Sequence, residues 1–424
     1  MPTFKPVGID ENSLFPDRVE TRLSTTIDGK LEPLRLVANT VIHAGDSITA
    51  QGSSGTQYAT GTTGYGYSGW SQVFSGKRLR MTRHAGVSGE RTDQILARLS
   101  TDVLAYAPGY VVVECGINDI QQDIPAATIQ ANLLAIYTTL LIAGVRVIAT
   151  TITPRNALTA GQKLLRLTVN RWIANTSATT PGMSLCDWNP LLEDPAIPHE
   201  WVADLTSDGT HPSAGGAVRM GMALADVINR LAPPVGSLAN ADIVSPNLGM
   251  TGTGGSKDAS ATGSVASSFA LWTSGGTTGT AVASKVTPTD GRAGEKQRVV
   301  IAAGNDKRWY LQQQIVAPGT TYQPGEWLYA EAEVDLNGDW LGSAKLFLDM
   351  YFAGPNTQTN DIWVPTAEPA LGYAITASRM VLRTPPFQVA ASGVTAIQAR
   401  VWFQNAGGTI DIARMAVYRT SAPA

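Results

Sequence analysis

An alternation of short apolar runs with longer helical periodicities, from about Val37 to Leu231, constrains the fold of this chain most strongly. It is typical of βαβ units around a parallel sheet, and the runs lack polar alternation, as strands covered on both faces should. The expected strands are Thr40–His43, Arg80–His84, Tyr110–Glu114, Val145–Thr151 and Ser184–Asp187. The expected helices are Gly69–Phe74, Arg91–Ala105, Ala126–Ala143, Ala160–Ala174 and Gly215–Leu231.

The pattern changes after Pro233-Pro234, where helical periodicity ends and Gly, Ser and Thr dominate Ser245–Thr280. Short alternating strands separated by turn residues follow, which predicts an antiparallel sandwich or jelly roll. These strands are Gln297–Ala302, Trp309–Ile315, Trp327–Leu336, Ala344–Phe352, Met380–Val389, Ala396–Gln404 and Ile410–Tyr418. The expected domains are an N-terminal arm over 1–36, an α/β domain over 37–232, a linker over 233–256 and a β-sandwich over 257–424. The arm is expected to serve as an attachment segment or as a strap against the first domain.

Charge and composition exclude several classes of protein. The net charge of −3 over 424 residues offers no basic stripe for nucleic acid, and no apolar run reaches the roughly 18 residues that a membrane span needs. Cys115 and Cys186 each lie inside an apolar run, so we expect free core thiols rather than a disulfide framework. The four histidines are scattered and no His or Cys pair has ligand spacing, so we expect no His- or Cys-based metal site, and a structural Ca²⁺ in the sandwich stays open. The opening MPTFKPVGIDENS has no apolar h-region, so Sec-dependent secretion is not expected.

Three residues supply the parts of a nucleophilic site. Gly45-Asp46-Ser47 follows the first expected strand, which places the Ser47 hydroxyl at the carboxyl edge of the sheet, where ligands bind in open α/β folds. A serine nucleophile needs a base and a group that orients the base, and His211 and Asp208, three residues apart before the last helix, can fill these roles. Taken singly, a turn serine and a helix-capping aspartate would explain the same residues.

The oxyanion formed when a serine attacks an ester needs hydrogen-bond donors already in place. Three candidates follow successive strands: the backbone N–H of Ser47, the backbone N–H of Gly89 and the side-chain amide of Asn118. A glycine at position 89 lets its N–H approach an anion without a Cβ in the way. Together these residues predict an oxyanion hole at the same edge of the sheet as Ser47.

In these blocks the sequence resembles the SGNH hydrolases, the superfamily of GDSL-type esterases. Four blocks occur in the family's order over roughly Val37–Leu231: Gly45-Asp46-Ser47, Gly86-Val87-Ser88-Gly89, Gly116-Ile117-Asn118-Asp119 and Asp208-Gly209-Thr210-His211-Pro212. The resemblance implies a flavodoxin-like three-layer αβα fold and cofactor-free ester hydrolysis. It also implies Ser47 as nucleophile, His211 as general base and acid, Asp208 as the residue that orients it, and Ser47, Gly89 and Asn118 as the oxyanion hole.

The segment Gln51–Trp70 is rich in Gly, Thr and aromatic residues and would overhang such a site. Sugar rings present apolar faces that stack on aromatic side chains, so Tyr65 and Tyr67 are predicted to contact a carbohydrate substrate. The alternative interpretation is that Trp70 and one of the tyrosines pack under the following helix.

The second domain is similar in pattern to jelly-roll modules that bind carbohydrate in many enzymes. Such a module raises the concentration of a catalytic site on a polymer, which favours an O-acetylated polysaccharide of a bacterial surface as the substrate. A structural or oligomerising sandwich is the alternative, so a homo-oligomer remains open. The segment Asp10–Leu23 is similar to openings of bacteriophage and prophage tail proteins, which predicts tail components as partners and a virion or extracellular location, with the cytoplasm as the alternative. A lipase or thioesterase, and a receptor-binding tail protein with a relic site, are the competing functions.

Overall fold

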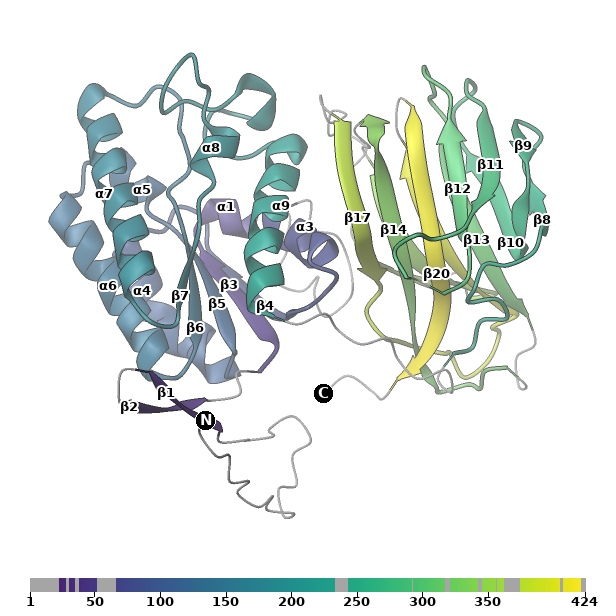
Figure 1. Ribbon diagram of the computed structural model, residues 1–424, viewed down its shortest axis with the longest axis horizontal. Helices are drawn as coiled ribbons and strands as arrows, with labels where there is room; N and C mark the ends of the chain where they lie inside the picture. Colours follow the sequence, from purple (N-terminus) through teal and green to yellow (C-terminus); the bar gives the residue numbers. More distant parts are fainter. Residues whose placement is uncertain are drawn as a thin grey trace.

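A computed structural model describes residues 23–27, 30–34, 38–51, 66–232, 243–291, 293–316, 321–341, 345–355, 357–361, 374–404 and 407–420. It consists of an α/β domain followed by a domain built from two β-sheets (Figure 1). Within the described segments, no helix combines the length and the apolar character needed to cross a membrane.

The α/β domain is organised around a five-stranded parallel sheet in the order β4-β3-β5-β6-β7. Its strands are β3 (Thr40–Gly45), β4 (Arg80–Gly86), β5 (Tyr110–Glu114), β6 (Arg146–Thr150) and β7 (Met183–Cys186). This is the strand order of flavodoxin-like folds, so the predicted αβα architecture is confirmed. The order reverses between β3 and β5, and open α/β sheets bind ligands beyond the carboxyl ends of the strands at this point.

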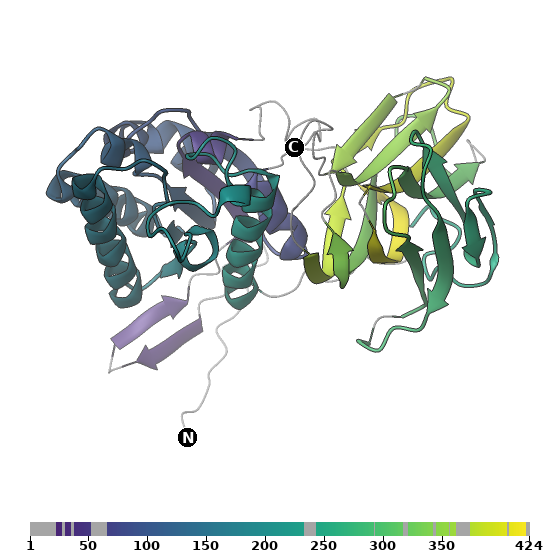
Figure 2. The ribbon, with the colours of Figure 1, turned by 90° about the horizontal axis from the view of Figure 1, so that it is seen from above.

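Helices cover both faces of the sheet. Figures 1 and 2 show α4, α6 and α7 on the face away from the second domain, and α3 and α9 on the face toward it. The helices are α1 (Ser47–Ala50), α3 (Tyr67–Phe74), α4 (Thr92–Asp102), α5 (Ile117–Gln121), α6 (Ala126–Ile142), α7 (Ala160–Thr179), α8 (Asn189–Leu192) and α9 (Ala214–Leu231), with 3₁₀ turns at Leu104–Tyr106 and Ala203–Leu205. The short helices α1, α5 and α8 carry too few turns to give a periodic sequence signal, and they were not expected.

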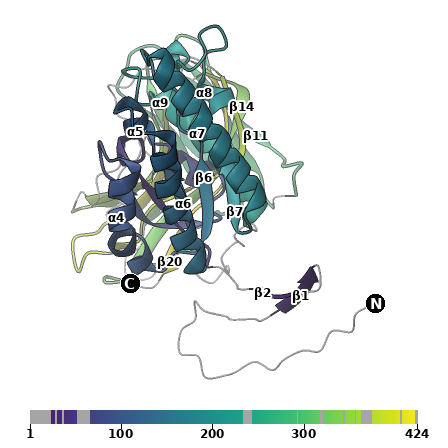
Figure 3. The same ribbon diagram turned by 90° about the vertical axis from the view of Figure 1, so that its left-hand side faces the viewer.

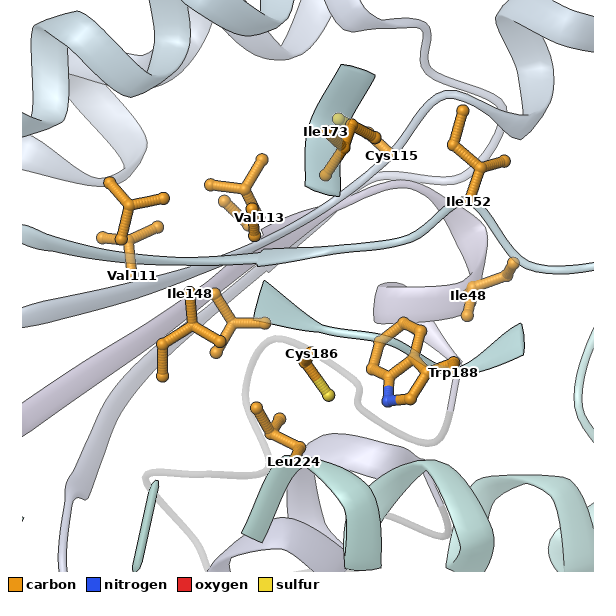
Figure 4. Close-up of a cluster of buried hydrophobic side chains, with 14 of the residues drawn as sticks. Ile48, Val111, Val113, Cys115, Ile148, Ile152, Ile173, Cys186, Trp188 and Leu224 are labelled. Carbon is orange, nitrogen blue, oxygen red and sulfur yellow. The ribbon is translucent and has the colours of Figure 1, made fainter. Parts of the chain in front are cut away.

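The core of this domain lies on both sides of the sheet. Figure 4 shows Ile173 from α7 on one side of the strands and Leu224 from α9 on the other. All five residues of β5 are buried, which explains why its sequence shows no polar alternation. Cys115 and Cys186 are both buried, free thiols in this core, and burial raises the pKa of each.

The second domain consists of two sheets whose inner side chains form one buried cluster. The six-stranded sheet has the order β16-β15-β19-β13-β10-β8, and the other has the order β17-β14-β20-β12-β11-β9, with β18 paired to β14. The strands are β8 (Gly254–Lys257), β9 (Ala261–Gly263), β10 (Val265–Ser274), β11 (Ala281–Val286), β12 (Lys296–Ile301), β13 (Arg308–Val316), β14 (Trp327–Leu341), β15 (Lys345–Ala353), β16 (Thr357–Asp361), β17 (Ala374–Arg383), β18 (Phe387–Gln388), β19 (Ala396–Gln404) and β20 (Gly408–Thr420). Trp70 and Val73 of α3 join the same cluster, so the two domains pack against each other.

The linker assigned to 233–256 is too long, because its second half belongs to the β domain. Ile243 forms a β-bridge with Tyr418, Val244 N–H donates to Val417 O at 2.8 Å, and β8 begins at Gly254. The Gly-, Ser- and Thr-rich stretch also contains β10, and β11 follows directly after it; both lacked a clear sequence signal because small residues fill many of their positions. Part of the N-terminal arm, β1 (Leu23–Ile27) and β2 (Lys30–Leu34), forms an antiparallel hairpin (Figure 3).

Candidate active site

Ser47 is the first residue of α1, immediately beyond the end of β3. Asp46 caps this helix, because its side chain accepts a hydrogen bond from the Ile48 N–H at 2.9 Å. Gly45 precedes Asp46 at a position where no side chain would fit, because a Cβ there would lie 2.3 Å from the carbonyl oxygen of Glu114 on β5. The sequence Gly-Asp-Ser therefore turns the chain sharply at the edge of the sheet and presents the Ser47 hydroxyl beyond it.

The imidazole of His211 lies between Ser47 and Asp208. His211 Nε2 is 2.9 Å from Ser47 Oγ, and Nδ1 is 2.7 Å from Asp208 Oδ2. An ionised carboxylate can only accept, so Nδ1 carries the proton and Nε2 is free to accept the hydrogen bond of the serine hydroxyl. Ser47 and His211 are 164 residues apart along the chain, yet together with Asp208 their side chains form a continuous hydrogen-bonded row.

The Asp208 carboxylate stays ionised because of the groups that donate to it. Burial by itself would raise its pKa, but the backbone N–H of His211, the imidazole and the backbone N–H of Thr210 outweigh burial and lower the pKa to about 2. The side chain is 54% exposed, so solvent also screens this charge. Asp208 therefore remains an acceptor for the imidazole throughout the pH range in which proteins are usually assayed.

The loop that carries Asp208 and His211 is held by its own backbone and by a neighbouring loop. Thr206 Oγ1 donates to His211 O at 2.8 Å, and Asn156 N–H donates to Gly209 O at 2.8 Å. Gly209 has φ +81°, a left-handed conformation that disfavours any residue with a Cβ. The Asp-Gly-Thr-His spacing thus closes a turn that aims the carboxylate and the imidazole in one direction.

The other two predicted oxyanion donors follow β4 and β5. Gly89 lies in the turn before α4 with φ +81° and has no atom within 4 Å of a Cβ position. Asn118 lies in the first turn of α5, where its amide nitrogen donates to Glu90 O at 2.9 Å and lies 3.4 Å from Asp46 Oδ2. Ser47, Gly89 and Asn118 are therefore positioned after three adjacent strands, β3, β4 and β5, at one edge of the sheet.

A cavity of about 320 Å³ opens beside Ser47. Its described lining consists of Ser47, Ala50, Gln51, Ser88, Ser207, Asp208 and His211. Only Ala50 is apolar, so this wall suits a small or polar group better than a long hydrocarbon chain. Gln51 and Ser88 lie in segments that the sequence analysis placed at the site, but neither was singled out as lining it, and Ser207 was missed because a single polar loop residue carries no motif signal.

The prediction that Tyr67 contacts substrate is wrong. Its side chain is fully buried, its hydroxyl lies 2.8 Å from Thr49 Oγ1, and its ring packs edge-on against Trp188. Tyr67 begins α3, and the face of that helix that carries it points into the core. Trp70 is also buried, as the alternative interpretation proposed, whereas Tyr65 lies outside the described residues.

Two buried carboxyl groups beneath the nucleophile were not singled out from the sequence. Asp46 and Glu114 are 0% and 2% exposed, and the negative charge of Glu114 acts on Asp46. Burial raises the pKa of Asp46 well above its usual value and raises the pKa of Glu114 to about 7. Only the register of β3 against β5, which pairs Gly45 with Glu114, reveals that these residues meet.

No group of three or more His, Cys, Asp or Glu side chains in the described segments is arranged to hold a metal ion. The row of hydroxyl, imidazole and carboxylate instead matches the requirements of a serine hydrolase.

Comparison with known proteins agrees with this class of site. Residues 44–219 match the model of the GDSL-like Lipase/Acylhydrolase family. This stretch of the chain is therefore a GDSL-like lipase/acylhydrolase domain. No curated protein sequence matches the chain.

Several solved structures are similar to slightly less than half of the chain. A GDSL-like lipase from Bacteroides thetaiotaomicron is 19% identical over 46% of this chain and 89% of its own, with a TM-score of 0.35. A mutant form of an acetyl-xylooligosaccharide esterase from Geobacillus is 20% identical over 45% of this chain and 93% of its own, with a TM-score of 0.37. A lipase/acylhydrolase from Enterococcus faecalis is 19% identical over 47% of this chain and 99% of its own, with a TM-score of 0.37.

Proposed function

We propose that this protein is a serine esterase that removes O-acetyl or similarly small acyl groups from a polysaccharide. The observation that carries the proposal is the row formed by Ser47, His211 and Asp208, with 2.9 Å and 2.7 Å between successive partners. A nucleophile, its base and the group that orients the base are then within hydrogen-bond reach before substrate arrives.

The reaction follows from this geometry in two steps. Ser47 Oγ attacks the ester carbonyl carbon while His211 Nε2 takes the hydroxyl proton, and the carbonyl oxygen becomes an oxyanion facing Ser47 N–H, Gly89 N–H and the Asn118 amide. The protonated imidazole gives its proton to the sugar oxygen, which leaves as an alcohol, and the acyl group stays on Ser47. His211 then removes a proton from water, which attacks the acyl-enzyme and releases acetate and the free serine.

The lining of the cavity supports a short acyl group. Each CH₂ group of a longer acyl chain would add about 0.8 kcal/mol of binding free energy only if it were buried against an apolar wall. In the described lining, Ala50 is the only apolar residue. A lipase or long-chain thioesterase would share the same catalytic residues but require an apolar cleft beside them.

The outward face of the six-stranded sheet supports a polymeric carbohydrate as substrate. On this face Tyr310 and Trp402 are half-buried, with ring centroids 4.2 Å apart, and the Arg400 guanidinium stacks over Tyr351. The neighbouring outward positions carry Gln312, Gln314 and Gln398. Half-exposed aromatic rings beside amide side chains can stack on sugar rings and hydrogen-bond their hydroxyls, so we propose a carbohydrate-binding jelly roll.

We propose a bacteriophage or prophage tail as the setting of this activity. The resemblance of Asp10–Leu23 to openings of tail proteins and the proposed sugar-binding domain support it. In this setting the partners are other tail components, with the acetylated polysaccharide as substrate. Recovery of the protein with purified particles is the expected result, and recovery only from the cytosol would contradict it.

Acetate release is the direct test of the proposed activity. The purified chain should release acetate from O-acetylated bacterial polysaccharides and should hydrolyse 4-nitrophenyl acetate at least about tenfold faster than the octanoate, since the polar wall gives little binding energy to added CH₂ groups. Ser47→Ala is the control and should release none. Faster hydrolysis of the octanoate would favour the lipase or thioesterase, and an unchanged host-binding phenotype in Ser47→Ala without any acetate release by the wild type would favour a relic site.

A second experiment tests the sandwich. Trp402→Ala should lower the rate of acetate release from polysaccharide several-fold and leave hydrolysis of 4-nitrophenyl acetate unchanged, because the effective concentration on the polymer falls while the catalytic residues stay intact. Val282→Ala, an exposed position on the other sheet, is the matched control. Equal rates on polysaccharide for wild type and Trp402→Ala would remove the proposed role of this face.

A further inference from the structure

The guanidinium of Arg98 joins the ends of two strands that lead into the proposed oxyanion hole. Arg98 lies in α4, and its Nη2 donates to the backbone oxygen of Gly45 at 3.0 Å and to that of Ala85 at 2.9 Å. Gly45 is the last residue of β3, directly before the nucleophile's turn, and Ala85 is the penultimate residue of β4. One nitrogen atom therefore holds the carboxyl ends of β3 and β4 to each other and to α4.

The other two nitrogens of the guanidinium bind carboxylates. Nε of Arg98 donates to Glu90 at 2.6 Å, and Nη1 donates to Asp102 at 3.1 Å. The side chains of Arg98 and Glu90 are only 15% and 16% exposed, so this ion pair is largely shielded from water. A planar guanidinium fixes the directions of all its donors relative to one another, which the single ammonium of a lysine cannot do. The four acceptors are therefore held in one geometry.

Glu90 connects this network to the other two proposed oxyanion donors. It directly follows Gly89, and its backbone oxygen accepts a hydrogen bond from the Asn118 amide at 2.9 Å. The Val87 N–H, at the other end of the same turn, donates to the Gly45 oxygen at 3.0 Å, and this is the oxygen that the guanidinium also binds. The guanidinium thus holds the turn that carries Gly89 at both of its ends.

We propose that Arg98 is a positioning residue for the oxyanion hole, because it sets the distance between the nucleophile's turn and the turn that carries Gly89. Arg98 is not part of the described lining of the cavity, so it acts through the groups that it holds. Misplacement of a catalytic group by about 1 Å can lower the rate about a hundredfold. The inference rests on the proposed function in its broader form, ester hydrolysis at Ser47 with these donors.

Arg98→Lys separates positioning from charge. Lysine keeps the positive charge but cannot bind the two strand ends and the two carboxylates together, so kcat for 4-nitrophenyl acetate should fall at least about tenfold while KM changes less than about threefold. Arg98→Ala, which also loses the charge, should lower kcat about a hundredfold. Wild-type kcat in Arg98→Lys would overturn the proposal.

The two carboxylate partners of Arg98 supply a matched pair of variants. Asp102 is the last residue of α4, at the opposite end of the helix from the turn that carries Gly89. Glu90→Ala should therefore lower kcat at least about tenfold, whereas Asp102→Ala should keep kcat within about twofold of the wild type, even where urea-induced unfolding shows similar losses of stability. Equal kcat values in the two variants would show that Arg98 serves the stability of the fold alone.

A boronic acid tests the oxyanion hole without turnover. Phenylboronic acid adds to the Ser47 hydroxyl and forms a tetrahedral anion, so it resembles the transition state of ester hydrolysis. Its inhibition constant should rise in Arg98→Lys by about the same factor by which kcat/KM falls, and should stay unchanged in Asp102→Ala. A lowered kcat/KM in Arg98→Lys with an unchanged inhibition constant would contradict the proposal.

Hydrogen exchange measured by mass spectrometry tests the arrangement without any enzyme activity. Peptides that cover residues 86–91 should exchange faster in Arg98→Lys than in the wild type, and Asp102→Ala should match the wild type. Equal exchange in Arg98→Lys and the wild type would disprove the positioning even if ester hydrolysis were established. Faster exchange confined to Arg98→Lys would support it even if the wild type hydrolysed no ester tested.

Discussion

Replacing Ser47 or His211 by alanine is expected to lower kcat for 4-nitrophenyl acetate by up to about a million-fold, and the double variant should be no slower than either single one. The reason is the hydrogen bond of 2.9 Å between Ser47 Oγ and His211 Nε2: the hydroxyl is a poor nucleophile without its base, and the base has no proton to take without the hydroxyl. Residues that act as one unit lose their whole contribution when any member is removed.

Steady-state kinetics of the four proteins, two single variants, the double variant and the wild type, measure this coupling. Asp208→Ala completes the series and should lose less, because an unoriented imidazole still accepts the proton part of the time. Losses that multiply in the double variant would show that Ser47 and His211 act independently, and the proposed mechanism would then fail.

Replacing Gly45 by alanine is expected to destabilise the α/β domain by about 3 kcal/mol or more. The new Cβ would lie 2.2 Å from Thr49 Oγ1 and 2.3 Å from the carbonyl oxygen of Glu114. The second contact is with the backbone of β5, so relief requires β3 and β5 to separate at the point where the site is built. Activity should fall together with stability, since Ser47 follows two residues later.

Urea-induced unfolding measures this cost, with Gly161→Ala as the matched control. Gly161 lies in the first turn of α7, where the nearest atom to a new Cβ, Thr159 Oγ1, is 3.9 Å away, so alanine there should be neutral or stabilise by up to about 1 kcal/mol. A Gly45→Ala protein as stable as the wild type would show that the edge of the sheet yields more readily than the contacts indicate.

The strands and long helices of the first domain could be predicted because burial imposes a periodic pattern. Tyr110–Glu114 is a strand with the expected bounds, and the expected helix Ala160–Ala174 is the first part of α7. The helix ends at Thr179, directly before Thr180-Pro181-Gly182, so the Pro-Gly stop lies beyond the predicted end and the last five residues of α7 were missed. Where small residues replace β-branched ones, as in β10 and β11, the pattern weakens and the strands were missed as well.

Order and spacing along the chain sufficed to nominate Ser47, Asp208, His211, Gly89 and Asn118, because carboxyl ends of parallel strands gather at one edge. Distance and burial were decided by tertiary structure alone. It places Tyr67 in the core rather than beside the substrate, and it brings Asp46 against Glu114. The local sequence determines which side chains a turn carries. Which of these side chains become buried, and which groups they contact, depends on the register of strands that are distant along the chain.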